Sequence, residues 1–438
     1  MIDRHRGHFL RSLLYTPTLA VALTGFLTVT LLGVRPAAAQ TFNVIYNFTL
    51  GTDGGGPLTG VTMDRNGNLY GTTGFGGTTG NGTVFKLSNT NSSWVLTPLY
   101  EFQGGSDGAT SNSPISIARD GQLYGATLYG GGTANCGILF KLQPPATAVP
   151  NAAGMWKETI LHSFVGGVND GCNPGSGFTW DQAGNFYGTT QDGGANGEQP
   201  PFTGFGIVYE MSPSASGWTE NILFNFLGST NGQFPLYAGV VFDNAGAMYG
   251  TVNGGGFFGG ACEGIGCGLV YKLVSSGGSW SETVLYSFRD GDDGEFPNTG
   301  VFFDRTGNVY GAAETGGSGQ GGTVFELTPS GGGWNFNILA SLQESPGGAQ
   351  GVETPLVMDA QGNLYGTTND EGPYNAGTVF KLTRTSNGWT YTDLHDFTDG
   401  TDGAYPVGPI VFDAAGNLYG AAILGGTDGA GTVWKITP

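Results

Sequence analysis

One short pattern recurs along the whole chain and constrains its fold more than any other feature. Seven Tyr-Gly dipeptides recur at intervals of 54 to 63 residues, each with a glycine three residues before the tyrosine. An aspartate stands six residues before the tyrosine in every copy except the second, which has Ala118. Seven copies with these fixed offsets indicate a repeat array or a propeller.

Each repeat divides into four short segments with the composition of β-strands. An apolar run ends at the aspartate, a glycine-containing turn follows, and then come segments such as NLYGTT, GTVFKL and a fourth that opens with tryptophan. Val, Thr, Tyr, Phe and Trp bounded by Gly, Asn and Ser are typical of strands. Beyond residue 39 no window has the apolar period of a helix. The sequence therefore predicts an all-β chain.

Seven repeats of four antiparallel strands predict a seven-bladed β-propeller. Residues 42–48 match a fourth strand without the first three, and residues 431–438 match a third strand without a fourth. We therefore expect the N-terminal strand to complete the last blade and close the ring, which leaves no unpaired edge between the first and last blades. An open solenoid of the same repeats is the alternative.

The pattern D-x-x-G-N-L-Y-G-T-T, followed by GG and GTVFKL, resembles the GloVer tandem repeat of bacterial "choice-of-anchor" proteins. The resemblance covers Phe42 to Pro438. It implies an exported, surface-associated protein, and it carries over no established activity, substrate or catalytic residue. Members of the family often bear a C-terminal anchor. The sequence stops at Pro438 without one, which favours release or non-covalent retention.

Residues 1–39 have the features of a secretory signal peptide. Arg4, Arg6 and Arg11 precede an apolar stretch over 13–34, and residues 37–39 offer a small-residue cleavage site. An uncleaved membrane anchor is the alternative, because the apolar stretch is long enough to span a bilayer. We predict that residues 40–438 form a single propeller domain. We expect a monomer, secreted or held at the cell surface or in the periplasm.

The predicted mature chain is strongly acidic, which limits its partners. The formal charge of the whole chain is −19, and removal of four basic residues and one acid with residues 1–39 brings it to −22. Only 11 Lys and Arg remain, so nucleic acid and anionic membrane surfaces are poor partners. We expect contact with a membrane only through an uncleaved leader.

All four cysteines follow residue 39, and their even number suits an oxidising compartment. We predict the disulfides Cys136–Cys172 and Cys262–Cys267, worth about 4 and about 2 kcal/mol on the chain-entropy model. A zinc site made of the four thiolates is the alternative. The absence of a C-x-x-C pair argues against it.

Residues of catalytic type are scarce or repeated. Beyond residue 39 the histidines are His162 and His395, at a position that other repeats fill with Tyr or Phe, so we expect rings packed between blades. So few histidines argue against a Ser-His-Asp triad or a histidine-based metal site. The repeated aspartate stands in equivalent turns, whereas acid–base catalysis needs two carboxylates in different environments. We expect it to cap the turn.

Asp-Gly pairs mark the turns between blades, and two of these turns are richer in acids. RDGDDG contains Asp290, Asp292 and Asp293, and TDGTDG contains Asp399 and Asp402. Clustered carboxylates beside backbone carbonyls suit Ca²⁺, although the spacing lacks the EF-hand pattern. Ca²⁺ binding and plain Asx-Gly turns both stay open at these positions. No other cofactor is expected.

Two long insertions, residues 191–205 and 253–267, separate the second and third segments of the third and fourth blades. In a propeller such loops share one face with the turns between blades, and insertions on one face often mark the binding face. Exposed aromatic rings beside carboxylates suit sugars or protein partners. Tolerated surface insertions are the alternative. The predicted ligand-binding residues are Phe202, Phe205, Phe257, Phe258, Glu198 and Glu263.

These features favour an exported, non-catalytic propeller that binds an extracellular glycan or a protein of the envelope or matrix. One alternative is a carbohydrate-active hydrolase or lyase that uses acids of the loops, such as Asp192, Glu198 and Glu263. Another is a structural surface protein that associates with itself. Scarce histidine, the lack of a nucleophile motif and nearly uniform repeats favour binding over catalysis.

Overall fold

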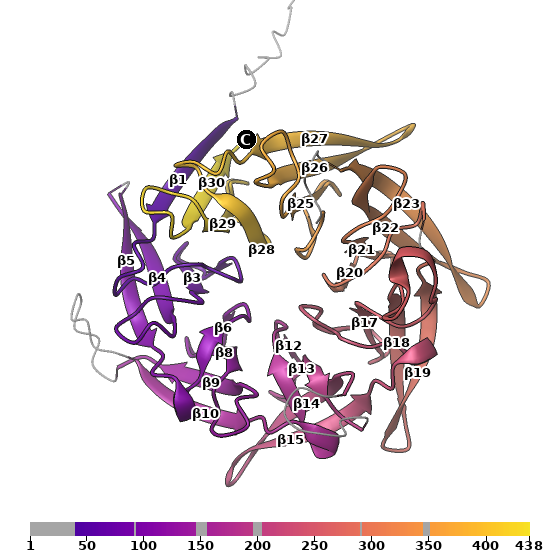
Figure 1. Cartoon of the computed structure of the whole chain (residues 1–438), viewed down its shortest axis with the longest axis horizontal. Coiled ribbons are helices and arrows are strands. Elements are labelled where there is room, and N and C mark those ends of the chain that lie inside the picture. Colours follow the sequence, from indigo (N-terminus) through magenta and orange to yellow (C-terminus); the bar gives the residue numbers. More distant parts are fainter. Residues whose placement is uncertain (1–39, 92, 146–155, 196–203, 290, 345–350) are drawn as a thin grey trace, which may run out of the picture. The chain divides into compact units, whose positions relative to one another are not determined.

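The computed structural model describes residues 40–91, 93–145, 156–195, 204–289, 291–344 and 351–438 (Figure 1). The predicted signal peptide, residues 1–39, lies outside the described residues. In the described ranges the chain consists of strands joined by loops and short 3₁₀ turns. No helix in these ranges is long and apolar enough to cross a membrane.

Seven antiparallel sheets stand in a ring as the blades of a propeller, which confirms the predicted fold (Figure 1). In blades two and three the innermost strand is divided in two. Blades one to three are β2 (Thr62–Met63), β3 (Leu69–Thr72), β4 (Thr83–Thr90), β5 (Ser93–Glu101); β6 (Ala109–Ser111), β7 (Ser116–Ile117), β8 (Leu123–Tyr129), β9 (Ile138–Gln143), β10 (Lys157–Ser163); and β11 (Gly171–Pro174), β12 (Thr179–Trp180), β13 (Phe186–Gly193), β14 (Ile207–Ser214), β15 (Gly217–Asn225). Blades four to seven are β16 (Val241–Phe242), β17 (Met248–Val252), β18 (Leu269–Ser276), β19 (Ser279–Ser287); β20 (Val301–Phe303), β21 (Val309–Ala313), β22 (Gln320–Ser330), β23 (Gly333–Gln343); β24 (Val357–Met358), β25 (Leu364–Thr368), β26 (Thr378–Thr385), β27 (Gly388–Asp396); and β28 (Ala404–Phe412), β29 (Leu418–Leu424), β30 (Thr432–Thr437), β1 (Thr41–Asn47).

The two ends of the described chain meet in blade seven. β1 pairs antiparallel with β30, from Thr41 opposite Thr437 to Asn47 opposite Thr432. The ring of Phe42 on β1 also stacks on His395 of β27, with ring centroids 3.5 Å apart. The N-terminal strand therefore closes the ring as predicted, and it contributes to the contact with blade six.

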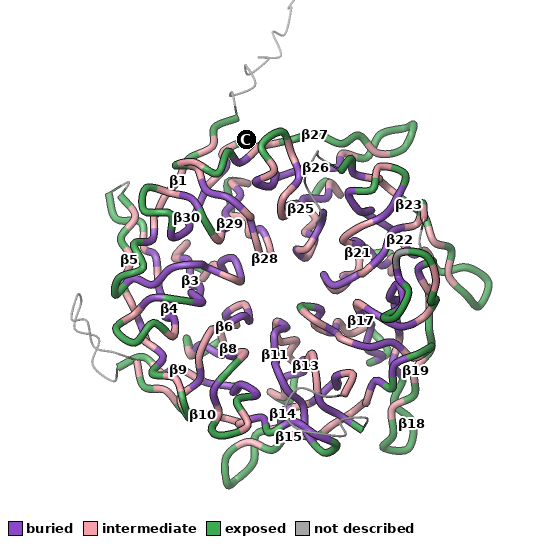
Figure 2. Tube along the Cα trace, in the orientation of Figure 1, coloured by how far each residue is buried: buried purple, intermediate pink, exposed green. Residues whose placement is uncertain are grey.

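The core lies between neighbouring blades, where buried strands follow one another around the ring (Figure 2). Phe102, which follows β5, packs edge-on against Phe140 of blade two at a centroid distance of 5.3 Å. The same aromatic pair recurs at most interfaces, and both rings are fully buried in this case. Aromatic pairs in this geometry stabilise a core beyond the area they bury.

This packing explains the glycine of each Tyr-Gly dipeptide. A Cβ atom on Gly71 would lie 2.6 Å from the Phe85 ring of the neighbouring strand, and on Gly366 it would lie 2.6 Å from the Phe380 ring. A contact this short forces the ring or the strand to move. The glycine therefore lets the inner strand approach a large buried ring in every blade.

The repeated aspartate caps the first turn of the blade, as predicted. Asp359 Oδ1 accepts hydrogen bonds from the backbone N–H groups of Gln361 and Asn363, both at 2.9 Å. Its Oδ2 accepts from the Asn363 amide at 2.7 Å and from the Tyr365 hydroxyl at 3.0 Å. In the second copy, where alanine replaces this residue, Asp120 accepts from the backbone of the turn instead. Aspartate, asparagine and tyrosine of the repeat thus belong to one local network.

Both predicted disulfides form, and no described cysteine is free. Cys136–Cys172 joins blade two to blade three, and Cys262–Cys267 closes part of the long loop of blade four. The alternative zinc site of four thiolates is therefore wrong. Disulfides persist in oxidising compartments, so they agree with the environment inferred from the sequence.

Candidate functional site

The two faces of the ring are built from different connections. We call loop face the side that carries the loops between the second and third strands and the turns between blades. Isolated bridges join these loops and turns, for example Gly55 with Phe75 and Gln233 with Gly254. The opposite side carries the tight turns capped by the repeated aspartate. The loops between the second and third strands, which include the two long insertions, therefore share one face with the turns between blades.

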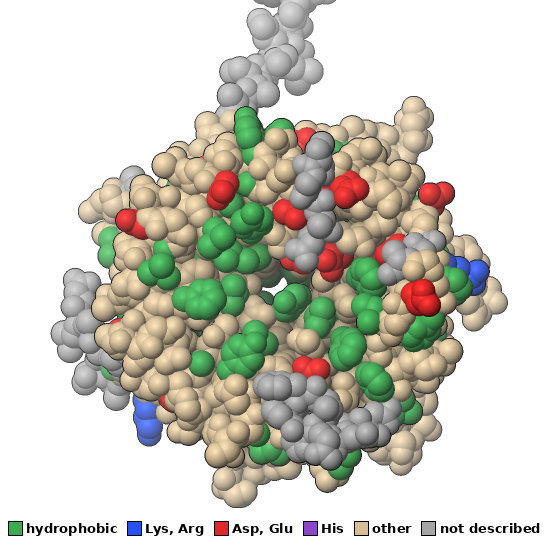
Figure 3. Space-filling view, viewed as in Figure 1, with side chains coloured by type: hydrophobic (Ala, Val, Ile, Leu, Met, Phe, Trp, Pro, Cys, Tyr) green, Lys and Arg blue, Asp and Glu red, His purple; other side chains and the backbone are tan. Residues whose placement is uncertain are grey.

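The loop face is apolar around the central opening (Figure 3). Of 18 exposed large hydrophobic side chains among the described residues, 12 lie in its loops and turns or at the channel. Contiguous exposed apolar surface commonly marks a binding site. The 12 are Leu50, Phe75, Tyr129, Val165, Val168, Leu227, Tyr237, Phe257, Phe258, Ile265, Tyr374 and Leu424.

The loop face is also poor in positive charge. Beyond residue 39, Arg289 is the one Lys or Arg that belongs to a loop or turn of this face. The repeated lysines instead lie above the repeated tyrosines of the strands, as with Lys381 at 5.3 Å from the Tyr365 ring centroid. In Figure 3 acidic side chains gather on one side of the central opening. A ligand of this face meets apolar and acidic groups.

At the loop face the central channel contains a cavity of about 230 Å³. Its lining comes from six blades and includes Leu58, Asn112, Tyr237, Glu353 and Asn369. A second cavity of about 270 Å³ shares Tyr237 and three prolines with the first, so the two follow one another along the channel. Tyr237 is 42% exposed and presents its ring to this space.

Glu353 and Asn369 make one side of the cavity polar, and Glu314 lies next to Glu353. The Asn369 amide donates a hydrogen bond to Glu353, and Asn298 donates to Glu314 at 2.8 Å. Burial raises the pKa of Glu353, against hydrogen bonds from Asn369 and Glu314. Burial and the charge of Glu353 likewise raise the pKa of the Tyr237 phenol. The channel mouth thus combines an aromatic ring, amides and two neighbouring carboxyl groups.

The structure brings together three of the six predicted ligand-binding residues. Phe257 and Phe258 are 44% and 43% exposed, and Glu263 is exposed in the same loop. The backbone N–H of Cys267 donates to the Phe257 carbonyl at 2.9 Å, so the disulfide segment holds the loop in place. This loop of blade four is a preformed apolar edge of the loop face.

The other three predicted residues are placed differently. Phe205 is half-buried and packs against the Phe234 ring at 6.0 Å, as part of the core between blades three and four. It immediately precedes Gly206 and β14, where the chain already enters the blade, so its ring turns toward the core. Phe202 and Glu198 lie outside the described residues. The insertion of blade three thus adds no described residue to an exposed aromatic rim.

The acidic turns proposed for Ca²⁺ use their carboxylates within the turn. Asp293 accepts a hydrogen bond from the Tyr286 hydroxyl at 2.7 Å. Asp402 accepts from the Thr398 backbone N–H at 3.1 Å and lies 3.1 Å from His395 Nε2. Within the described ranges, neither these residues nor Asp292 and Asp399 belong to a compact group of three metal-ligating side chains. Asp290 lies outside the described residues, and Ca²⁺ binding at these turns stays a prediction.

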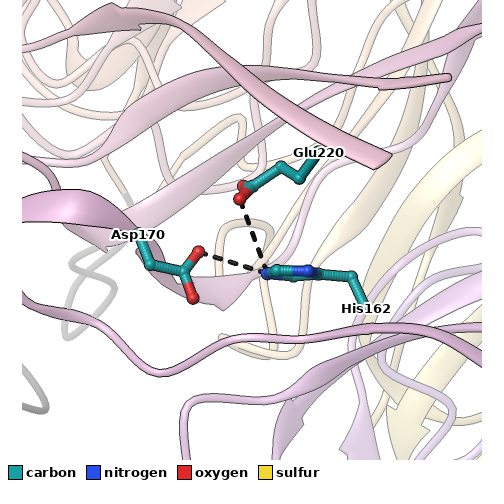
Figure 4. A group of neighbouring side chains, drawn as sticks. All are labelled: His162, Asp170 and Glu220. Atoms are coloured by element: carbon teal, nitrogen blue, oxygen red, sulfur yellow. Dashed lines mark hydrogen bonds and ion pairs between the residues drawn. The ribbon is translucent and has the colours of Figure 1, made fainter. Parts of the chain in front are cut away.

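The sequence predicts packed rings at His162 and His395, and both rings do contact phenylalanines. It misses the polar partners of His162. Nε2 of His162 lies 3.2 Å from Asp170 Oδ1 and 3.6 Å from Glu220 Oε2, which comes from the next blade (Figure 4). The sequence contains a signal for these partners, because a glutamate stands two residues after the tryptophan in three successive repeats. These glutamates are Glu158, Glu220 and Glu282.

Solved structures with a similar fold have diverse descriptions. A polysaccharide lyase, an ulvan lyase bound to a GlcA(1-4)Rha3S ligand, is 10% identical with a TM-score of 0.52, over 88% of this chain and 94% of that one. A putative 6-phosphogluconolactonase from Bacteroides uniformis is 14% identical with a TM-score of 0.49, over 81% of this chain and 88% of that one. At 10% identity, the likeness to the lyase shows a shared fold alone. No curated protein matches the chain.

The family comparison agrees with the repeat itself. The family model of the Gloeobacter/Verrucomicrobia repeat matches residues 29–199 and 262–438. The two matches include the Tyr-Gly strand of six of the seven blades, five of them with the repeated aspartate, and the interval between them contains the fourth copy. This confirms the resemblance found in the sequence. The chain belongs to the Gloeobacter/Verrucomicrobia repeat family.

Proposed function

We propose that the protein is an exported, non-catalytic β-propeller that binds an extracellular glycan at the mouth of its central channel. The observation that carries this proposal is the cavity at the loop face, where the exposed ring of Tyr237 lies among Asn112, Asn369 and Glu353. Sugars are bound by rings that cover their C–H faces and by amides and carboxylates that hydrogen-bond their hydroxyl groups. The cavity, smaller than a typical site for drug-sized ligands, suits a single sugar unit.

The charge of the face narrows the class of glycan. Acidic side chains gather at the opening and Arg289 is the one basic residue in a loop or turn of this face. A polyanionic polysaccharide would meet a repulsive potential there, whereas neutral sugars and amino sugars would not. We therefore expect a neutral or amino-substituted glycan.

The loop of blade four would extend the contact beyond one sugar. Phe257, Phe258 and Ile265 are exposed on a segment that the Cys262–Cys267 disulfide closes. A site that is rigid before binding loses less conformational entropy when the ligand arrives. These side chains would contact further sugar units of a chain whose end occupies the cavity.

One observation favours a second function, a carbohydrate-active hydrolase. Glu353 has a raised pKa and a neighbouring carboxyl group, Glu314, and an acid kept protonated by burial is a common general acid. However, the two carboxyl groups are in hydrogen-bond contact. Glycosidases hold their carboxyl pair about 5 to 9.5 Å apart, so that a sugar or a water fits between. This geometry supports binding over hydrolysis.

The test is a glycan-array screen of residues 40–438, repeated after treatment with EDTA. We expect binding to neutral or amino glycans that is abolished by Tyr237→Ala and weakened by Phe257→Ala with Phe258→Ala. Val95→Ala, at an exposed apolar residue of the outer strand β5, is the matched control and should bind normally. Glu353→Gln distinguishes the alternatives, because a hydrolase would lose turnover while keeping its ligand.

Failure to bind any glycan would refute the proposal. Sedimentation of the same sample would then show whether the protein associates with itself, and a protein partner would be the remaining candidate. Loss of binding after EDTA treatment alone would instead place a metal ion in the binding mechanism.

A further inference from the structure

A second group of side chains, unrelated to the channel, lies between blades two and three. His162 on β10, Asp170 after the 3₁₀ turn η2 (Gly167–Asn169) and Glu220 on β15 point toward one another (Figure 4). One ligating atom from each lies within 4.8 Å of the other two. Among the described residues this is the one compact group of three His, Cys, Asp or Glu side chains.

Asp170 in this group is buried, His162 and Glu220 are partly buried, and one oxygen atom of the group lacks a hydrogen-bond partner. The side chains of His162, Asp170 and Glu220 are 24%, 7% and 10% exposed. Glu220 Oε1 is buried and accepts no hydrogen bond within the described structure. Two carboxyl groups in such a place are costly unless positive charge compensates them. A protonated histidine would supply one charge, whereas a divalent cation supplies two.

We propose that His162, Asp170 and Glu220 bind one divalent transition-metal ion, with Zn²⁺ as the best fit. Zinc is bound by imidazole nitrogen and carboxylate oxygen at about 2.0–2.2 Å, which places neighbouring ligands of a tetrahedral site about 3.3–3.6 Å apart. The two distances from His162 Nε2, 3.2 and 3.6 Å, are close to this separation. Glu220 Oε1 or a water would complete the coordination.

The donor set distinguishes this site from a calcium site. Ca²⁺ takes six to eight oxygen ligands, and an imidazole is not among its usual donors. One nitrogen and two carboxylates instead suit zinc and its neighbours in the transition series. The ion would connect β10, the following turn and β15, next to the Cys136–Cys172 disulfide, and so fasten blade two to blade three.

The other interfaces of the ring offer matched sites with different chemistry. Tyr100 takes the place of the histidine at one of them, and its hydroxyl donates to Asp107 and to Glu158. At the next, the residues are Phe224, Asn231 and Glu282, with the Asn231 amide donating to Glu282 at 2.9 Å. These equivalent positions also suggest a competing explanation for the His162 group. The glutamates would then form a structural layer between blades that needs no metal.

A further interface keeps the histidine and loses the glutamate. His395 lies 3.1 Å from Asp402, but the position of the third ligand holds Phe42, stacked on the imidazole. His162 is thus the one described histidine that meets two carboxyl groups. His395→Tyr is therefore a control that removes a histidine without removing a metal ligand.

The experiment uses residues 40–438 purified without a polyhistidine tag and freed of metal with a chelator. The chain then offers two histidines and no free cysteine, so background zinc binding is low. We expect calorimetric titration with ZnCl₂ to show one ion per chain and Zn²⁺ to raise the thermal midpoint. Loss of groups that only support a ligand costs about 10- to 100-fold in metal affinity, so loss of a ligand should cost at least about 100-fold.

His162→Tyr and Glu220→Gln should each show that loss, while His395→Tyr and Glu282→Gln should bind Zn²⁺ as the wild type does. His162→Tyr should fold, because Tyr100 occupies the equivalent position, and its circular dichroism spectrum checks this. Co²⁺ bound to the wild type should show the visible absorption of a tetrahedral site. Absence of stoichiometric binding, or equal binding by His162→Tyr, would overturn the proposal. Glycan binding by His162→Tyr should be unchanged, so this test is independent of the proposed function.

Discussion

Replacing Glu282 with glutamine is expected to make the fold more resistant to alkaline pH. Glu282 lies on β19, where its Oε2 accepts a hydrogen bond from the Asn231 amide at 2.9 Å. Its Oε1 is buried and has no hydrogen-bond partner within the described ranges. Burial raises the pKa of Glu282 from 4.5 to about 7, against the effect of the Asn231 hydrogen bond. The folded protein therefore keeps a proton that the unfolded chain loses.

The sign and size of the effect follow from this difference. Below about pH 4.5 the glutamate is protonated in both states, and its contribution to the free energy of unfolding is complete. As the pH rises toward about 7, the unfolded chain is ionised first, and stability falls by about 1.4 kcal/mol per pH unit. The full difference is about 3 kcal/mol, and the partial solvent contact of the side chain reduces the expected loss to about 1–3 kcal/mol.

Glutamine has no proton to lose, so Glu282→Gln removes this pH dependence. Between about pH 4.5 and about pH 8 the variant should gain about 1–3 kcal/mol on the wild type. The measurement is the free energy of urea unfolding, followed by tryptophan fluorescence at constant ionic strength. Glu263→Gln, at an exposed residue of the neighbouring loop, is the matched control and should follow the wild type at every pH.

The pH dependence of the difference between variant and wild type decides the outcome. A part of the difference that is the same at every pH reports a change in packing, since the amide group also lacks a second partner. A difference that does not change with pH at all would mean that Glu282 ionises in the folded protein as it does in the unfolded chain. That result would refute the reasoning from burial, and it would remove the same argument for Glu158, whose pKa burial raises to about 9.

Three further substitutions test the structural basis of the repeat. Asp359→Ala should lower stability by about 1–2 kcal/mol near neutral pH by uncapping its turn. Burial raises the pKa of Asp359, but hydrogen bonds from Asn363, Tyr365 and Gln361 outweigh it and hold the pKa below 3.8. The stabilisation is therefore present above pH 3.8 and is lost as the pH falls below the lowered pKa. Urea unfolding should show the difference in stability between variant and wild type vanishing well below pH 3.8. Cys136→Ser with Cys172→Ser should cost about 4 kcal/mol, measured in urea against the oxidised wild type. Gly366→Ala should lower the free energy of unfolding by about 1–3 kcal/mol, because its Cβ would lie 2.6 Å from the Phe380 ring. A lower thermal midpoint would show this loss.

The sequence predicts the fold well because most of its repeated residues act within one blade. Asp359 and Tyr365 of one copy are six residues apart and share a hydrogen bond. Gly366 lies against Phe380 on the adjacent strand. Such contacts need the same residues at the same offsets in every copy. The number of copies in the sequence therefore gives the number of blades. The end segments show where the ring closes for the same reason.

The sequence predicts the candidate site poorly because that site is assembled across blades. Asn112, Tyr237 and Glu353 meet at the channel, although they are far apart in the chain and belong to no common motif. The sequence also cannot distinguish a loop aromatic that faces solvent from one that enters the core. Phe257 and Phe205 both stand in long insertions, and the second is half-buried against its neighbours.

Comparing the repeats with one another reveals some contacts between residues that one repeat alone does not indicate. The ring residue of the fourth strand is a hydrogen-bond donor where the following turn carries aspartate, as with Tyr46 and Asp53 or Tyr286 and Asp293. Where the ring is Phe224, which cannot donate, the turn carries Asn231 instead. Seven copies in one chain therefore contain correlated changes that report contacts. Departures from the repeat that change together, such as a histidine facing a glutamate of the next blade, are where a new property of this fold is best sought.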